Sequence, residues 1–210
     1  MPLSRLFIDN DIFILLAGAG LLEEAVAALG FTFADTYRLE ALPFVVKSNK
    51  KQPKLPTEVV DLVLQQCTQI SVLSERPSDD LLQMLAAAPT IDAGEAVLYV
   101  LLAEQPSAFL TSGDKRAMRA IAQAPSLTAI RTAVAGRVIS LETLLLRLVK
   151  AHPVAMVGAA LTPILPLNTV VRVAFSPNNL VQPAECVQAL TRYQQALIEE
   201  VGANFLWQDD

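Results

Sequence analysis

The stretch RLFIDNDIFILLAG, residues 5–18, decides the fold class. Residues 5–8 are mostly apolar and predict a short buried β-strand, and a helix is expected over 11–17. Between these two elements lie the carboxylates of Asp9 and Asp11. A carboxylate at the end of a buried strand is costly unless something pairs with it. The position of Asp9 therefore indicates a functional edge of a sheet.

Further strands and helices follow in alternation. Strands are expected at 70–74, 107–112 and 137–140, and helices at 20–29, 35–42, 57–69, 79–88, 93–104, 114–123 and 141–151, with a lysine-rich loop at 47–56. This alternation predicts a three-layer α/β/α fold with a central, mostly parallel sheet. Ligands of such sheets bind beyond the carboxyl ends of the strands.

The composition indicates a packed domain and excludes several classes of protein. Of 210 residues, 53% are hydrophobic and 18% charged, and the mean hydropathy is +0.43. No apolar run reaches the ~20 residues of a membrane span, and Asp9 and Asp11 interrupt any secretory signal. We therefore expect a cytoplasmic protein with no membrane contact, whose surplus apolar surface forms a homodimer or partner interface.

The α/β pattern ends near residue 150. We expect one domain over 1–150 and an apolar, helical C-terminal extension over 151–210, which packs on the domain or forms an interface. Five prolines interrupt this extension, and its last part, 184–201, is an amphipathic helix.

Histidine and cysteine are too sparse for a zinc site. Cys67 and Cys186 lie far apart, and the single histidine, His152, stands at the end of an expected helix, where a structural role is the rule. A resident metal would need oxygen ligands, which favours Mg²⁺ or Mn²⁺.

Acidic residues recur where helices begin. Asp92 and Glu95 open the helix at 93–104, and Asp114 follows the strand at 107–112. Several of these carboxylates converge if the strands are parallel, and a divalent cation would neutralise them. The alternative interpretation is helix capping, with Asp92 and Glu95 as a capping box and Asp114 as an N-cap.

Three segments carry a resemblance to a known family. FIDNDIFI (7–14), IDAGEAVLYVLL (91–102) and FLTSGDKRAMRAI (109–121) resemble, in this order, the motifs of PIN domains, over roughly residues 4–150. Asp9 matches the acid that ends the first strand, while Asp11 stands where Asn or Ser is more usual. Glu40 is placed like the family's second acid, either Asp92 or Glu95 like the third, and Ser112-Gly113-Asp114 like the fourth motif.

The resemblance implies a metal-dependent endoribonuclease that cleaves single-stranded RNA. It implies catalytic roles for Asp9, Glu40, Glu95 and Asp114, and Mg²⁺ or Mn²⁺ bound by Asp9, Asp92, Glu95 and Asp114, with Asp11 as a further candidate. RNA contacts are expected from Lys47, Lys50, Lys51, Lys54, Ser112, Lys115 and Arg116. Many small bacterial members are toxins inhibited by an antitoxin peptide, so the resemblance permits an antitoxin partner.

Two other functions remain as alternatives, one suggested by the opening stretch and one by the apolar C-terminal region. The Asp9-x-Asp11 spacing is also similar to haloacid dehalogenase-like phosphatases, in which the two acids serve as nucleophile and general acid. That family's later acidic motif does not match, because Lys-Arg-Ala-Met follows Asp114. The second alternative is a non-catalytic, PIN-like interaction module.

Overall fold

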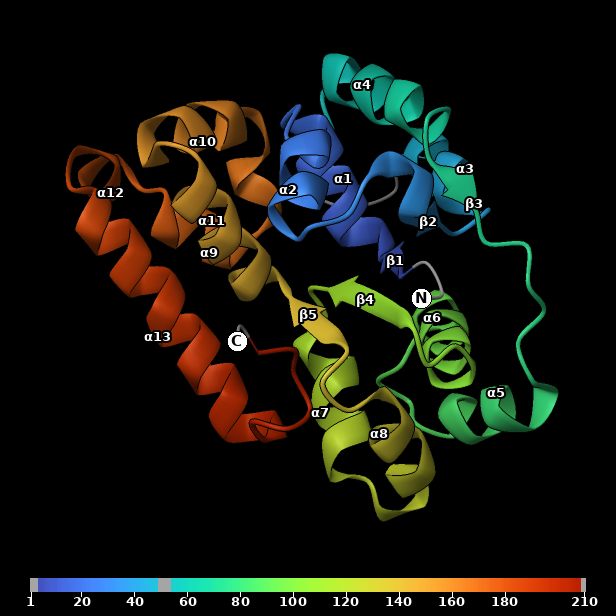
Figure 1. Cartoon of the computed structure of the whole chain (residues 1–210). Coiled ribbons are helices and arrows are strands. Elements are labelled where there is room, and N and C mark those ends of the chain that lie inside the picture. The colour runs from blue at the N-terminus through green and yellow to red at the C-terminus, as the bar shows by residue number, and fades with distance from the viewer. Residues whose placement is uncertain (1–3, 49–53, 209–210) are drawn as a thin grey trace.

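A sheet of five strands forms the centre of the computed structural model, which describes residues 4–48 and 54–208 (Figure 1). The strands are β1 (Arg5–Ile8), β2 (Thr36–Arg38), β3 (Ser71–Val72), β4 (Ala108–Ser112) and β5 (Val138–Ser140). Their order across the sheet is β3-β2-β1-β4-β5. Every neighbouring pair is parallel. The predicted α/β fold with a parallel sheet is confirmed.

Helices cover both faces of the sheet (Figure 1). One face carries α1 (Asn10–Gly18), α2 (Leu22–Ala28), α3 (Leu42–Ser48), α4 (Thr57–Cys67) and α9 (Leu141–Ala151). The other face carries α5 (Asp79–Ala86), α6 (Ala93–Glu104), α7 (Lys115–Gln123) and α8 (Thr128–Val134). The molecule therefore has three layers and two hydrophobic cores, one on each side of the sheet.

Strand β1 contributes to both cores. Leu6 and Ile8 belong to one core and Phe7 to the other, as expected because successive side chains of a strand point to opposite faces. A strand buried on both faces is continuously apolar, which is the pattern seen in residues 6–8.

The helix expected over 35–42 is wrong. A 3₁₀ turn over Phe33–Asp35 leads directly into β2. Thr36 lies opposite Leu6, and Arg38 lies opposite Ile8, in the parallel pair with β1. This pairing with a distant strand overrides the local helical pattern, and it buries the side chains of Thr36 and Arg38. The sequence predicts a loop over 47–56. Residues 47–48 are helical instead, and residues 49–53 lie outside the described part.

The other predicted elements are present within a few residues of their expected bounds, and α6 begins and ends where the sequence predicts. The two cysteines, Cys67 and Cys186, are buried and free. None of the helices in residues 4–48 and 54–208 combines the length and the apolarity needed to cross a lipid bilayer.

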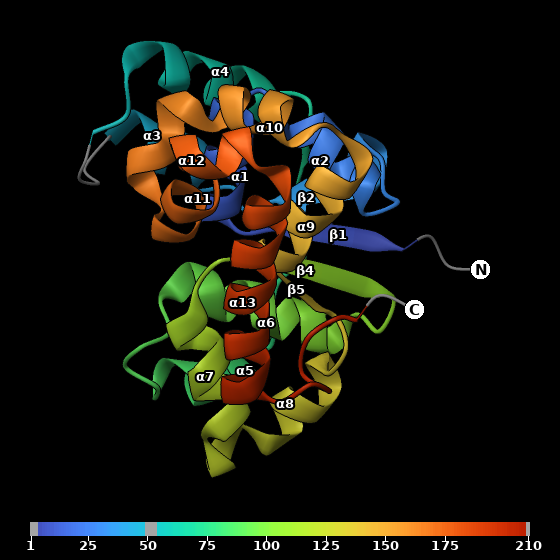
Figure 2. The ribbon, with the colours of Figure 1, turned by 90° about the vertical axis from the view of Figure 1, so that its left-hand side faces the viewer.

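The C-terminal extension contains α10 (Val154–Leu161), a 3₁₀ segment (Thr162–Leu167), α11 (Thr169–Ala174), α12 (Pro177–Val181) and α13 (Pro183–Val201). Helix α13 runs past both layers of helices (Figure 2). Its Cys186 and Leu190 lie in the core with α1, and its Leu197 and Val201 lie in the core with α6. After α13, Leu206 forms a parallel bridge with Val138 of β5. The extension thus packs against the sheet domain along its length.

Gly18 permits the closest packing between α1 and its neighbours. A Cβ atom at this position would lie 2.7 Å from Cγ1 of Val59 in α4 and 3.2 Å from Cγ2 of Ile164. We expect Gly18→Ala to lower the free energy of unfolding by about 1–3 kcal/mol, since overpacking displaces buried groups. Urea denaturation measures the change. Val59→Ala in the same chain should recover part of the loss, and a strictly additive double variant would contradict the steric explanation.

Candidate acidic site at the carboxyl edge of the sheet

The chain reverses its direction of winding between β1 and β4. From β1 it proceeds to β2 and β3 on one side, and it then crosses back to β4 and β5 on the other. The crevice beyond the carboxyl ends of the strands at such a point is the usual ligand site of open α/β sheets. Asp9 follows β1 directly, and Asp114 lies two residues beyond β4. The backbone N–H of Asp9 donates to the carbonyl of Thr111 at 3.1 Å, which holds the two strand ends together.

Asp9 occupies the N-cap position of α1 without acting as a side-chain cap. Its backbone carbonyl accepts from the N–H of Phe13 at 2.9 Å. Within the described residues, its carboxylate accepts no capping hydrogen bond from the backbone N–H groups in the first turn of α1. The Asp9 side chain is 8% exposed. Helix capping therefore does not account for a buried acid at this position.

Asp92 and Glu95 form the capping box that their spacing predicts. The N–H of Glu95 donates to Oδ1 of Asp92 at 2.8 Å, and the N–H of Asp92 donates to Oε2 of Glu95 at 2.9 Å. Asp92 is exposed, whereas Glu95 is only 7% exposed. The structure thus places Glu95 on the inner side of the helix start and Asp92 on the outer side.

Asp114 acts as a helix cap and also forms an ion pair. Its Oδ1 accepts from the backbone N–H groups of Arg116 (2.7 Å) and Ala117 (3.0 Å), and its Oδ2 accepts from Nη2 of Arg116 at 2.8 Å. Burial raises the pKa of Asp114, but these hydrogen bonds outweigh burial and hold the pKa below its usual range. The capping interpretation of Asp114 is confirmed.

The carboxyl groups of Glu95 and Asp114 lie against each other. Burial, together with the adjacent charge of Asp114, raises the pKa of Glu95 from 4.5 to about 8, against a backbone hydrogen bond at Asp92 that lowers it. At neutral pH Glu95 therefore keeps a proton, which bonds the two carboxyl groups together. Two adjacent carboxylates would repel each other, and the proton on Glu95 removes this repulsion.

Tyr99 was missed by the sequence analysis. It lies one helical turn after Glu95, and its ring is 1% exposed. Its hydroxyl oxygen is buried, and the side chain of Ser112 interacts with it. Burial raises the pKa of Tyr99, and the charges of Asp9, Glu95 and Asp114 all raise it further. The hydroxyl therefore lies within the electric field of all three acids, and the i, i+4 spacing from Glu95 is the signal that could have revealed it.

A second ion pair lies beside this cluster. Nζ of Lys115 is 2.6 Å from Oε1 of Glu142, whose side chain is 1% exposed, and Nζ also lies 5.3 Å from the ring centroid of Tyr193 in α13. Glu142 follows β5 at the same edge of the sheet, so the sequence contained a signal for it that we did not use. Lys115, expected as an RNA contact, is thus engaged within the protein.

The remaining predicted residues are exposed, belong to the cluster or lie outside the described part. Glu40 is exposed in the turn after β2, and Asp11 is exposed in the first turn of α1. Lys47 and Lys54 are exposed, while Lys50 and Lys51 lie outside the described residues. Ser112 lies in the cluster, because its Oγ accepts from the N–H of Asp114 at 3.3 Å. The structure therefore brings together Asp9, Glu95, Ser112 and Asp114.

The oxygen-rich cluster has the donor chemistry that Mg²⁺ or Mn²⁺ prefers, and the buried Tyr99 hydroxyl is a further polar atom available there. In the parts of the chain that the structure describes, however, no group of three or more His, Cys, Asp or Glu side chains is arranged so that it could hold a metal ion. A cation at this edge would have to replace the Glu95 proton and displace Arg116 from Oδ2 of Asp114.

The pKa of Glu95 leads to a prediction about stability. Between pH 4.5 and about 8 the folded state retains a proton on Glu95 that the unfolded state loses, so the free energy of unfolding decreases as the pH rises through this window. Glu95→Gln keeps an acceptor for the Asp92 N–H and needs no proton. We expect it to stabilise the fold at pH 8, on the order of 1 kcal/mol, and to have little effect at pH 4.5. Urea denaturation at both pH values tests this, and equal effects at the two would contradict it.

The Lys115–Glu142 pair leads to a second prediction. Lys115→Met leaves a buried carboxylate without its cation, which should cost on the order of 3 kcal/mol of unfolding free energy. The double variant Lys115→Met with Glu142→Gln should recover most of this loss. Thermal and urea denaturation measure both effects. A single variant as stable as the natural chain would show that Lys115 is available for another role.

Comparison of the chain with protein-family models, with curated proteins and with solved structures found no match. The functional interpretation therefore rests on the geometry of this edge of the sheet and on the motifs that the sequence places there.

Proposed function

We propose that this protein is a metal-dependent endoribonuclease of the PIN type, which hydrolyses phosphodiester bonds of single-stranded RNA with Mg²⁺ or Mn²⁺. One observation supports this proposal above all others. Asp9 and Asp114 follow the two strands at the winding reversal of the parallel sheet, Glu95 lies against Asp114, and all three charges act on the buried hydroxyl of Tyr99. The PIN-like motifs of the sequence contain the same three acids.

The proposed roles follow from the geometry. Asp9, Glu95 and Asp114 would hold the cation, which when bound supplies Lewis acidity and a more acidic water molecule. Glu95 would have to release its proton for the cation to bind. The Arg116 side chain, which is 74% exposed, would then be released from Asp114 and available to a phosphate group. The buried Tyr99 hydroxyl would orient a carboxylate or a water molecule by donating its proton.

A second candidate is supported by a different observation. Oδ1 of Asp114 caps α7 and Oδ2 pairs with Arg116, so the protein's own groups already satisfy this carboxylate. That arrangement suits a non-catalytic interaction module with a PIN-like fold. The two candidates differ in whether a divalent cation binds and whether RNA is cleaved.

The test is cleavage of a fluorescent single-stranded RNA by the full chain in Mg²⁺ or Mn²⁺. We expect Asp9→Asn to lower the cleavage rate at least 100-fold, because one cation ligand is lost, and EDTA to abolish cleavage. Asp11→Asn is the matched control. Asp11 lies two residues away but is exposed on α1, so its rate should stay within about threefold of the natural chain.

Other results of this experiment would favour one of the alternative functions. No cleavage, together with no Mn²⁺ binding by calorimetry, would contradict the nuclease and favour the interaction module. Hydrolysis of p-nitrophenyl phosphate that is lost in both Asp9→Asn and Asp11→Asn would favour the haloacid dehalogenase-like phosphatase, in which both acids act. RNA cleavage that persists in Asp9→Asn would refute the site assignment.

A further inference from the structure

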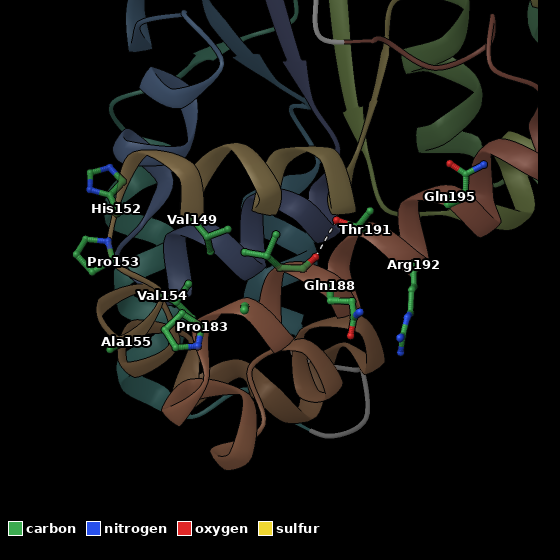
Figure 3. A pocket seen from close by; sticks show the side chains of 12 residues that line it. Val149, His152, Pro153, Val154, Ala155, Pro183, Gln188, Thr191, Arg192 and Gln195 are labelled. Atoms are coloured by element: carbon green, nitrogen blue, oxygen red, sulfur yellow. Dashed lines mark hydrogen bonds between the residues drawn. The ribbon is translucent and has the colours of Figure 1, made fainter.

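A surface groove follows helices α9 and α13. It consists of two adjacent hollows of about 1020 Å³ and 440 Å³, which share Val149 and Val187 as lining residues. The larger hollow extends to His152 and Pro153, between the end of α9 and the start of α10 (Figure 3). We refer to the two hollows together as the α9–α13 groove. None of its lining residues belongs to the acidic cluster, so its role does not depend on the proposed function.

The walls of the groove are largely apolar. Val149, Pro153 and Val154 line one side, and Pro183 and Val187 line the other. Val187 is 40% exposed, which is unusual for a large apolar side chain. Thr191 contributes little polarity, because its hydroxyl donates within α13 to the carbonyl of Val187 at 2.8 Å (Figure 3). Apolar surface of this kind is typical of a binding site for a peptide or a protein.

The charges of the groove have one sign. Its basic lining residues are Arg147, Lys150 and Arg192, and no Asp or Glu is among the described residues that line it. The chain as a whole has 21 acidic and 16 basic residues. Arg147 stacks on Trp207, 4.9 Å from the ring centroid. Lys150 and Arg192 form no ion pair with any described residue. An acidic partner would supply the missing counter-charges.

The dimensions of the groove fit one helix. Its lining residues on α13 extend from Pro183 to Gln195, a rise of about 18 Å, which is the length of about 12 helical residues. A helix with one apolar face commonly binds between two helices in this way. RNA fits the groove less well, since two unpaired cations give weak phosphate binding and no Phe, Tyr or Trp of the described chain lines the groove for base stacking.

We propose that the α9–α13 groove binds an acidic amphipathic helix of about 12 residues that belongs to another protein. Its apolar side chains cover Val149 and Val187, and its carboxylates pair with Lys150 and Arg192. Apolar burial contributes most of the affinity, and the ion pairs select the acidic partner and fix its direction in the groove.

Fluorescence anisotropy tests the proposal with two labelled 14-residue peptides and the full chain. One peptide carries leucines on one helical face with flanking glutamates, and the other has lysine at every glutamate position. We expect the glutamate peptide to bind at least 10-fold more tightly than the lysine peptide. Arg192→Glu and Val187→Asp should each weaken binding of the glutamate peptide at least fivefold. The double variant Lys150→Glu with Arg192→Glu should bind the lysine peptide more tightly than the glutamate peptide.

Matched variants on the same extension serve as controls. Arg172→Glu on α11 and Val181→Asp on α12 change exposed residues that line neither hollow, so both should bind within twofold of the natural chain. Circular dichroism verifies that every variant is folded.

Three results would overturn the proposal. The first is no saturable binding of the glutamate peptide, or binding that Arg192→Glu and Val187→Asp leave unchanged. The second is a dimer in sedimentation velocity that Val187→Asp dissociates, which would assign the groove to a second copy of the chain. The third is tighter binding of a 12-nucleotide RNA than of the glutamate peptide, with the RNA affinity lost in Arg192→Glu.

Discussion

The burial of β1 on both faces is the constraint on which the rest of the structure depends. Leu6, Phe7 and Ile8 are each at most 1% exposed, and they alternate between the two cores. A strand in this position needs a neighbour on each edge and helices on each face, which requires the crossover from β3 back to β4. The first residue that leaves the strand, Asp9, therefore emerges where the winding reverses. The location of this carboxylate is a consequence of hydrophobic burial.

The acidic edge is costly in free energy, and the protein offsets the cost with its own groups. Glu95 keeps a proton beside Asp114, Arg116 pairs with Asp114, and Lys115 pairs with the buried Glu142. The Tyr99 hydroxyl is buried beside Ser112, where burial and the surrounding acids raise its pKa. Strongly shifted pKa values and buried polar groups concentrate at functional sites, because selection retains them for binding or catalysis at the expense of stability.

Helix α13 contacts the hydrophobic cores on both sides of the sheet and also forms part of the protein surface. Its inner face contacts both cores through residues such as Leu190 and Leu197, and its Tyr193 lies near Lys115 at the acidic edge. Its outer face forms one wall of the α9–α13 groove. At the groove, Gln194 of α13 donates to Oγ1 of Thr143 in α9 at 2.9 Å, and both residues line the smaller hollow.

The sequence by itself determined the elements that depend on local patterns. The apolar run before Asp9, the capping box of Asp92 and Glu95, and the cap at Asp114 each follow from a few neighbouring residues, and the structure contains all of them. Only the tertiary structure decided what depends on distant contacts. Residues 36–38 became a strand because β1, some thirty residues away, pairs with them. Glu95 rather than Asp92 lies against Asp114, and Tyr99 lies near these acids. Lys115 pairs with Glu142. These contacts depend on the order of the strands and the orientation of the helices, which bring together side chains from distant parts of the sequence.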